Sequence, residues 1–133
     1  IDVRYRDMNG APLDPQSVAV STDFYAVVTI TNTSGYERYA DLALTHIVPA
    51  GWEITSERDL SAVTYQDIRD DRVLSYFDLR SGESKEIPIK LTAAYKGRYY
   101  LPSVYCEAMY DNSVRALRKG EWIEVVGQTP AGN

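Results

Sequence analysis

The segment spanning residues 95–110 alternates between two rows of side chains, as a β-strand requires. One row is nearly continuous apolar surface and is expected to face a core; it consists of Tyr100, Pro102, Val104, Cys106, Ala108 and Tyr110. The other row mixes aromatic and polar side chains and is expected to be partly exposed; it consists of Tyr99, Leu101, Ser103, Tyr105, Glu107 and Met109. Because Pro102 has no N–H for a ladder, this strand is expected to lie near a sheet edge or to carry a bulge there.

Other strand-like segments occur along the whole chain. The strongest is residues 24–31, which places Phe24, Ala26, Val28 and Ile30 on one face. The further predicted strands are residues 1–6, 41–49, 52–55, 73–79, 86–94 and 122–126. Residues 56–71 lack a clean period and predict an inserted loop, with at most a short helical turn, while residues 111–113 predict a turn. About seven short strands predict an all-β, antiparallel sandwich of the immunoglobulin or fibronectin-III-like class.

Length and charge limit the organisation and the partners. The 133 residues fit one sandwich domain at 1–127, followed by a loose polar tail at 128–133. The chain has no initiator methionine and starts in a strand-like alternation, so we expect it to be a fragment of a longer protein. A net charge of −5 argues against nucleic-acid binding, and no apolar run is long enough for direct membrane insertion.

A charge-dense stretch is the first candidate site. Its members are Tyr65, Asp67, Arg69, Asp70, Asp71 and Arg72. The carboxylates are suitable ligands for calcium, but the two arginines are interleaved with them and the spacing of an EF-hand is missing. The sequence therefore favours a salt-bridge network or a charged docking patch over a metal site.

Tyrosines form the second candidate site. The chain has 11 of them, and tyrosine is frequent at protein interfaces. Tyr99, Tyr105 and Met109 share the outward row of the long alternating segment, so they are candidates for a contact surface. The alternative is that these rings only cover one another on the exposed face of a sheet.

No catalytic residue, cofactor site or metal site is predicted. His46 is the only histidine, and the Gly-x-Ser-x-Gly nucleophile motif is absent from the chain. Cys106 lies in an apolar row without a basic neighbour that would lower its pKa, so a small buried core residue is the better interpretation. The sequence therefore predicts a protein that is not an enzyme.

Four motifs resemble the last domain of bacterial α2-macroglobulins: IVPAGWE at 47–53, DIRDDRV at 67–73, GRYYLP at 97–102 and EAMYD at 107–111. The resemblance extends over roughly residues 23–126, and the second motif is the most specific. The first and third motifs also occur in other sandwich domains, where Trp52 is most often a core or rim residue.

The resemblance implies a non-catalytic, C-terminal macroglobulin domain that corresponds to the receptor-binding domain of the animal proteins. Its parent would be a lipid-anchored envelope protein that faces the periplasm and traps proteases after bait-region cleavage. The domain would dock against the thioester domain and other macroglobulin domains to hold the uncleaved state. The family's thioester motif, Cys-x-Glu-Gln, is absent here, since Cys106 is followed by Glu107, Ala108 and Met109. The alternative is a carbohydrate-binding or stalk module of a secreted enzyme, with Trp52 and surface tyrosines stacking on sugar rings.

Overall fold

The computed structural model describes residues 1–35 and 37–127; the tail predicted at 128–133 lies outside the described residues. The described chain forms 12 strands in three sheets. The four-stranded sheet has the order β1 (Asp2–Asp7), β3 (Asp23–Thr31), β8 (Ser84–Ala93) and β5 (Trp52–Ile54). The five-stranded sheet has the order β11 (Asp111–Arg118), β10 (Val104–Ala108), β4 (Tyr39–Ile47), β7 (Arg72–Leu79) and β6 (Tyr65–Ile68).

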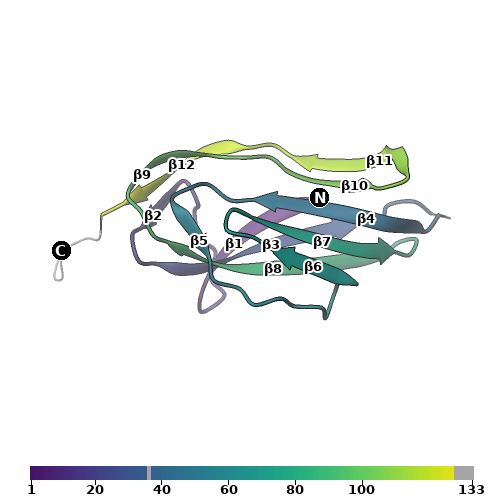
Figure 1. Ribbon diagram of the computed structural model, residues 1–133, viewed down its shortest axis with the longest axis horizontal. Coiled ribbons are helices and arrows are strands. Elements are labelled where there is room, and N and C mark those ends of the chain that lie inside the picture. The colour runs from purple at the N-terminus through teal and green to yellow at the C-terminus, as the bar shows by residue number, and fades with distance from the viewer. Residues whose placement is uncertain (36, 128–133) are drawn as a thin grey trace.

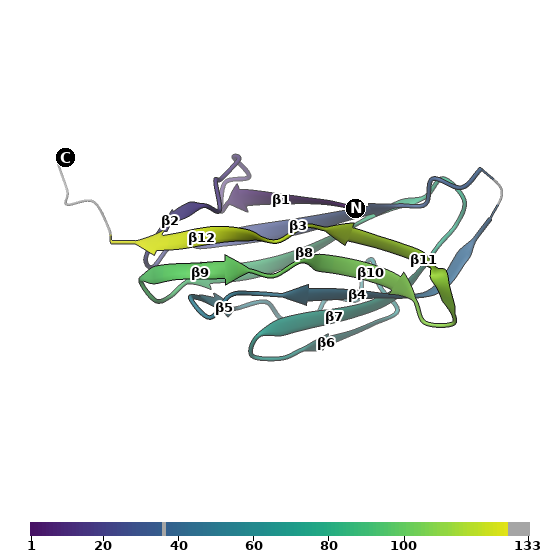
Figure 2. The ribbon, with the colours of Figure 1, turned by 90° about the horizontal axis from the view of Figure 1, so that it is seen from above.

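A third sheet extends one end of the molecule. It has the order β2 (Ser17–Ala19), β12 (Glu121–Val126) and β9 (Gly97–Leu101), and its β2–β12 pair is parallel. In Figure 1 the five-stranded sheet faces the viewer and the four-stranded sheet lies behind it. Figure 2 shows that β9 leads into β10 and β11 into β12, so the third sheet continues one edge of the sandwich. The predicted all-β sandwich is confirmed, with more strands than the sequence suggested.

Alternating side chains from both large sheets form the core. β3 alternates most regularly, with Phe24, Ala26 and Val28 fully buried and Ile30 almost so. Phe24 packs edge-to-face against the Trp52 ring, with ring centroids 5.0 Å apart. The core prediction for Trp52 is therefore correct, and the burial of β3 follows directly from its period of two.

The predicted alternation of residues 95–110 is wrong in its first half and at its last residue. Tyr100, expected inside, is 48% exposed, whereas Leu101, expected outside, is 4% exposed. Tyr110, also expected inside, is 83% exposed because it lies in the turn between β10 and β11. The segment is two strands, β9 and β10, which belong to different sheets and are separated by Pro102 and Ser103. This break changes which alternate residues face the core, so Leu101 and Val104 both point inward.

Two other segments also differ from the prediction. Residues 56–71 do not form a continuous loop, because Tyr65–Ile68 pairs with β7 as strand β6. The described residues of this segment include no helical turn. The predicted turn at 111–113 instead starts β11, which pairs with β10. In both cases a partner strand supplies the hydrogen bonds that make a weakly patterned segment a strand.

Tyr99 closes the end of the sandwich over Gly51. Its hydroxyl donates to the backbone carbonyls of Tyr95 and Lys96, at 3.2 Å each. A Cβ on Gly51 would overlap the Tyr99 ring, lying 2.7 Å from Cδ2. Tyr99 is thus partly buried by packing against the core, which corrects its predicted place on an exposed contact face.

We expect Gly51→Ala to lower the free energy of unfolding by about 2 kcal/mol, the usual cost of forcing an extra methyl into packed surroundings. Urea unfolding followed by tryptophan fluorescence measures this change. Gly35→Ala is the matched control, because a Cβ there meets no atom within 4 Å. Adding Tyr99→Leu to Gly51→Ala should recover part of the loss, and strictly additive effects would contradict the proposed overlap.

Candidate functional site

The hairpin between β6 and β7 carries the charge-dense candidate site. Arg69 Nε lies 3.0 Å from an oxygen of Asp67, and Arg72 forms two bonds of 3.0 Å to the carboxylate of Asp71. Hydrogen bonding to Arg72 lowers the pKa of Asp71 below its ordinary value. Asp70 is exposed and has no ion-pair partner in the described part of the chain.

These ion pairs support the salt-bridge interpretation of the hairpin. The arginines already engage the carboxylates of Asp67 and Asp71. Among residues 1–35 and 37–127, no three histidine, cysteine or acidic side chains are placed to hold a metal ion. Asp70 is left as the one acidic group of the turn that is available to a partner.

The five-stranded sheet brings the hairpin and Tyr105 onto one surface. Cross-strand pairing produces a row across its outer face that consists of Leu117, Tyr105, Thr45, Leu74 and Asp67. In the neighbouring row Tyr65 lies opposite Tyr76, with ring centroids 6.0 Å apart. We call the exposed part of these rows, together with the Arg69–Arg72 turn, the docking face.

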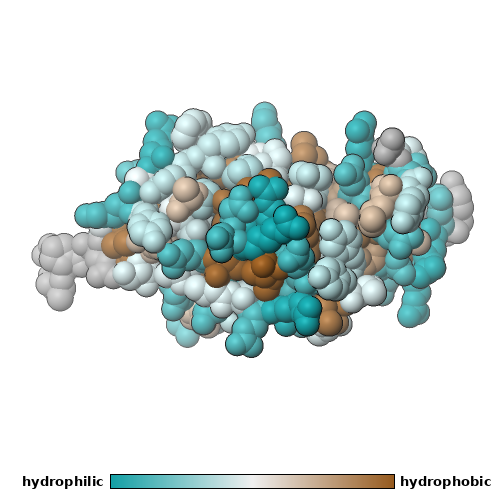
Figure 3. All heavy atoms as spheres, in the orientation of Figure 1, coloured by the Kyte–Doolittle hydropathy of each residue, from teal (hydrophilic) through white to brown (hydrophobic). Residues whose placement is uncertain are grey.

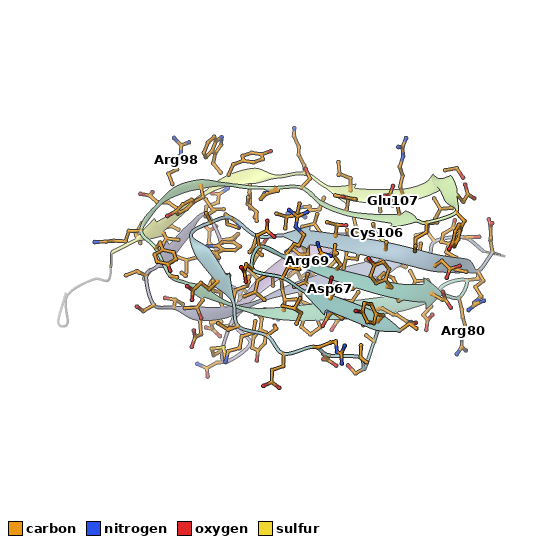
Figure 4. The ribbon with its side chains drawn as sticks, in the orientation of Figure 1. Asp67, Arg69, Arg80, Arg98, Cys106 and Glu107 are labelled. Atoms are coloured by element: carbon orange, nitrogen blue, oxygen red, sulfur yellow. The ribbon has the colours of Figure 1, made fainter. Side chains whose placement is uncertain are left out.

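The docking face combines charge with apolar surface. Figure 3 shows a hydrophilic cluster near the centre of this side, bordered by hydrophobic atoms. Figure 4 places Asp67 and Arg69 at the centre of the same side, with Glu107 nearer its upper edge. An apolar and aromatic area with charges beside it is typical of a protein-binding surface rather than a catalytic cleft.

Met109 lies at the turn between β10 and β11. Its side chain is 53% exposed, and its backbone N–H donates to the carbonyl of Asp41 at 3.0 Å. That bond holds the turn against the start of β4. Met109 therefore extends the exposed surface beyond Tyr105, as the sequence predicted, whereas Tyr99 belongs to the packed end of the sandwich.

A second exposed cluster was missed by the sequence prediction. Trp122 on β12 is 55% exposed and lies opposite Tyr100, with ring centroids 5.5 Å apart and planes at 74°. The Arg98 guanidinium lies 4.8 Å from the Trp122 ring centroid and points away from the molecule (Figure 4). The alternation of β12 contained the signal, since burying Ile123 and Val125 requires Trp122 to face outward.

The buried polar and thiol groups do not form a catalytic site. His46 is buried within β4, and burial lowers its pKa to about 4. Its Nε2 has no hydrogen-bond partner among the described residues. Burial raises the pKa of the Cys106 thiol to about 12, so that thiol is a poor nucleophile.

Burial also tests the carbohydrate-binding alternative. That alternative assigned Trp52 a role in stacking on sugar rings. Trp52 is 2% exposed, packed between Phe24 and Tyr5, so this part of the alternative is wrong. The described residues include no helix that is long and apolar enough to cross a membrane.

Comparison with known proteins identifies the family. The family described as "Bacterial Alpha-2-macroglobulin MG10 domain" matches residues 1–112. The chain belongs to this family. It is a macroglobulin domain rather than an enzyme.

Individual relatives agree with this assignment. The macroglobulin domain is 29% identical over 128 residues to an alpha-2-macroglobulin of Pasteurella multocida, and the match covers 91% of this chain but 6% of the relative. A mutant Salmonella alpha-2-macroglobulin has the same fold, with a TM-score of 0.82 at 18% identity, covering 94% of this chain and 9% of that chain. Trypsin-activated alpha-2-macroglobulin from Escherichia coli gives a TM-score of 0.80 at 16% identity, covering 93% and 10%. The macroglobulin domain thus spans only a small part of its relatives.

Proposed function

We propose that this chain is the C-terminal macroglobulin domain, equivalent to the receptor-binding domain, of a bacterial protease inhibitor of the alpha-2-macroglobulin type. Its role is to dock against the thioester domain and other macroglobulin domains of its parent and so hold the uncleaved state. Target proteases are met by the parent chain rather than by this domain. The parent is a lipid-anchored protein on the periplasmic face of the cell envelope.

The docking face is the observation that carries this proposal. It gathers Tyr65, Tyr105 and the Arg69–Arg72 turn on one side of the five-stranded sheet, although they are distant in sequence. Exposed tyrosines beside arginines have the composition of an interaction hot spot. The chain also has neither a reactive thiol nor the family's thioester motif, so a holding role suits it better than a covalent one. The E. coli relative described as trypsin-activated supports the protease-dependent role.

The cluster of Arg98, Tyr100 and Trp122 is a second surface suited to contact with the parent. The rings and the guanidinium hold one another in place on two paired strands, so little side-chain freedom is lost on binding. Arg98 remains exposed and suits an acidic group of the partner. We include this cluster in the proposed interdomain contact.

Reversing charge at the hairpin tests the docking face. In the full-length parent, Asp70→Lys combined with Asp71→Lys should speed protease-triggered opening about tenfold, which corresponds to about 1.4 kcal/mol of lost stabilisation of the closed form. The change removes the one unpaired carboxylate of the turn and places a second positive charge beside Arg72. The rate can be followed by small-angle scattering or native gel mobility after addition of a protease.

Glu57→Lys combined with Glu86→Lys is the matched control, since both glutamates are exposed outside the hairpin and the two substitutions together change the charge equally. It should leave the opening rate unchanged. If the hairpin variant remains folded and opens at the unaltered rate, the hairpin has no part in holding the closed form.

A further inference from the structure

The sandwich is open along the side where β1 and β11 lie. Each is the last strand of its own sheet, and Figure 2 shows that the start of β1 lies near the end of β11. Arg118 of β11 bridges the gap to Asp2 of β1, with 3.6 Å between Nη1 and Oδ1. Within the described chain, β11 pairs only with β10, so its other edge presents unpaired backbone groups. Such an edge is a template for an additional strand.

An apolar slot lies directly beside this edge. The slot has a volume of about 270 Å³, and its floor consists of the core side chains Ile30, Leu42, Leu79 and Cys106. Val114 and Ala116 of β11 form part of its rim, and both are only partly buried. The opening therefore gives access to the main core from the edge of the sheet.

The dimensions of the slot and the edge suit an extended chain. Alternate side chains of a strand lie on one face, about 7 Å apart. A strand added to β11 would place one or two such side chains over the slot while its backbone bonds to β11. A compact apolar molecule would fill the slot but leave the strand edge unpaired.

The charges beside the slot select for an acidic segment. Arg115 is exposed on β11 and has no ion pair within the described residues. The single carboxylate of Asp2 is shared by Arg118 and Arg4, whose Nε lies 2.9 Å from it. Among the described residues, Arg115 is the one charged side chain that lines the slot, although the whole chain has a net charge of −5. Arginine forks match carboxylates in geometry and charge.

We propose that the β1–β11 side binds an extended acidic peptide segment, which adds as a strand to the free edge of β11 and places alternate apolar side chains in the slot. Backbone pairing provides affinity and the slot provides selectivity for apolar residues, as in other β-augmentation complexes. Arg115 pairs with a carboxylate of the segment. This site borders the docking face, because Arg115 ends the same cross-strand row as Tyr65 and Tyr76. It differs from that face in its occupant, which is a single added strand.

A synthetic nonapeptide with valine at alternate positions and glutamate between them is the probe. Titration against the 133-residue chain should give saturable binding, and hydrogen exchange of the β11 amides should slow at least tenfold at saturation. A second peptide of the same sequence carries N-methyl groups on the amides that would bond to β11. It should bind at least tenfold more weakly. Equal affinity of the two peptides, or binding without protection of β11, would overturn the proposal.

Arg115→Glu tests the charge selection, since this exposed substitution leaves the core untouched. It should weaken binding of the glutamate peptide at least tenfold and favour a peptide with lysine in place of glutamate. Val114→Lys fills the rim of the slot and should abolish binding of both the glutamate and the lysine peptide. If Arg115→Glu binds the glutamate peptide with unchanged affinity, the site does not select an acidic segment. If a small apolar probe binds tightly and displaces the peptide, the site does not bind its ligand as an added strand.

Discussion

Lowering the pH from 7 to 4 is expected to remove about 3 kcal/mol from the free energy of unfolding through His46 alone. Burial lowers the pKa of this histidine to about 4 in the folded chain, against an ordinary value of 6.5. Between these values the unfolded chain binds a proton that the folded chain resists, so stability is lost as the pH falls. The size follows from about 1.4 kcal/mol for each pH unit of the window.

Urea unfolding at pH 7, 6, 5 and 4 measures this loss. His46→Leu is the matched variant, because leucine fills this buried position with an apolar side chain that cannot titrate. Its stability should be nearly constant over the window. A wild-type profile with the same slope as His46→Leu would show that the buried imidazole does not govern acid sensitivity.

Carboxylates affect a different pH range. Hydrogen bonds from Arg4, Ser61, Arg72 and Ser113 lower the pKa values of four aspartates at the surface below the ordinary value of 3.8; these are Asp2, Asp59, Asp71 and Asp111. A group with a lowered pKa loses its contribution as the pH falls through that lowered value. As the pH falls, the loss of stability through these carboxylates therefore starts where the loss through His46 is almost complete. The two losses can be separated in one titration.

The sequence predicted strands best where the period of two is unbroken. Residues 24–31 were placed correctly because both neighbours of β3 lie in the same sheet and bury one row. Residues 95–110 were misjudged because β9 and β10 pair with different strands, and alternation along one chain contains no information about that change. β6 and β11 were missed because their hydrogen-bond partners, rather than their own residues, make them strands.

The docking face shows the same limit. Charge density identified the Asp67–Arg72 stretch, and tyrosine frequency identified Tyr105, but nothing in the sequence placed them on one sheet. Their shared row depends on β4 and β7 lying between them. The outward position of Trp122, in contrast, could have been predicted from its own strand, because burial of Ile123 and Val125 places Trp122 on the opposite face.

Replacing Asn32 by alanine is expected to lower the free energy of unfolding by about 3 kcal/mol. Asn32 is 1% exposed, and its Nδ2 donates to the carbonyls of Glu37 and Leu79 at 2.7 and 3.2 Å. Its Oδ1 accepts the N–H of Ser34 at 2.9 Å. The side chain thus joins the loop after β3 to the end of β7, and its removal leaves buried polar groups unpaired.

Denaturant titration at pH 7 measures this effect without interference from His46. Thr31→Ala removes a neighbouring but exposed hydrogen bond, that of the hydroxyl to Ser84 at 2.6 Å, and should cost less than about 1 kcal/mol. Asn32→Asp separates geometry from donor chemistry, because the carboxylate retains the acceptor for Ser34 but directs negative charge at the two carbonyls. It should be at least as unstable as Asn32→Ala. An alanine variant as stable as Thr31→Ala would mean that water satisfies those carbonyls and that Asn32 does not hold the loops together.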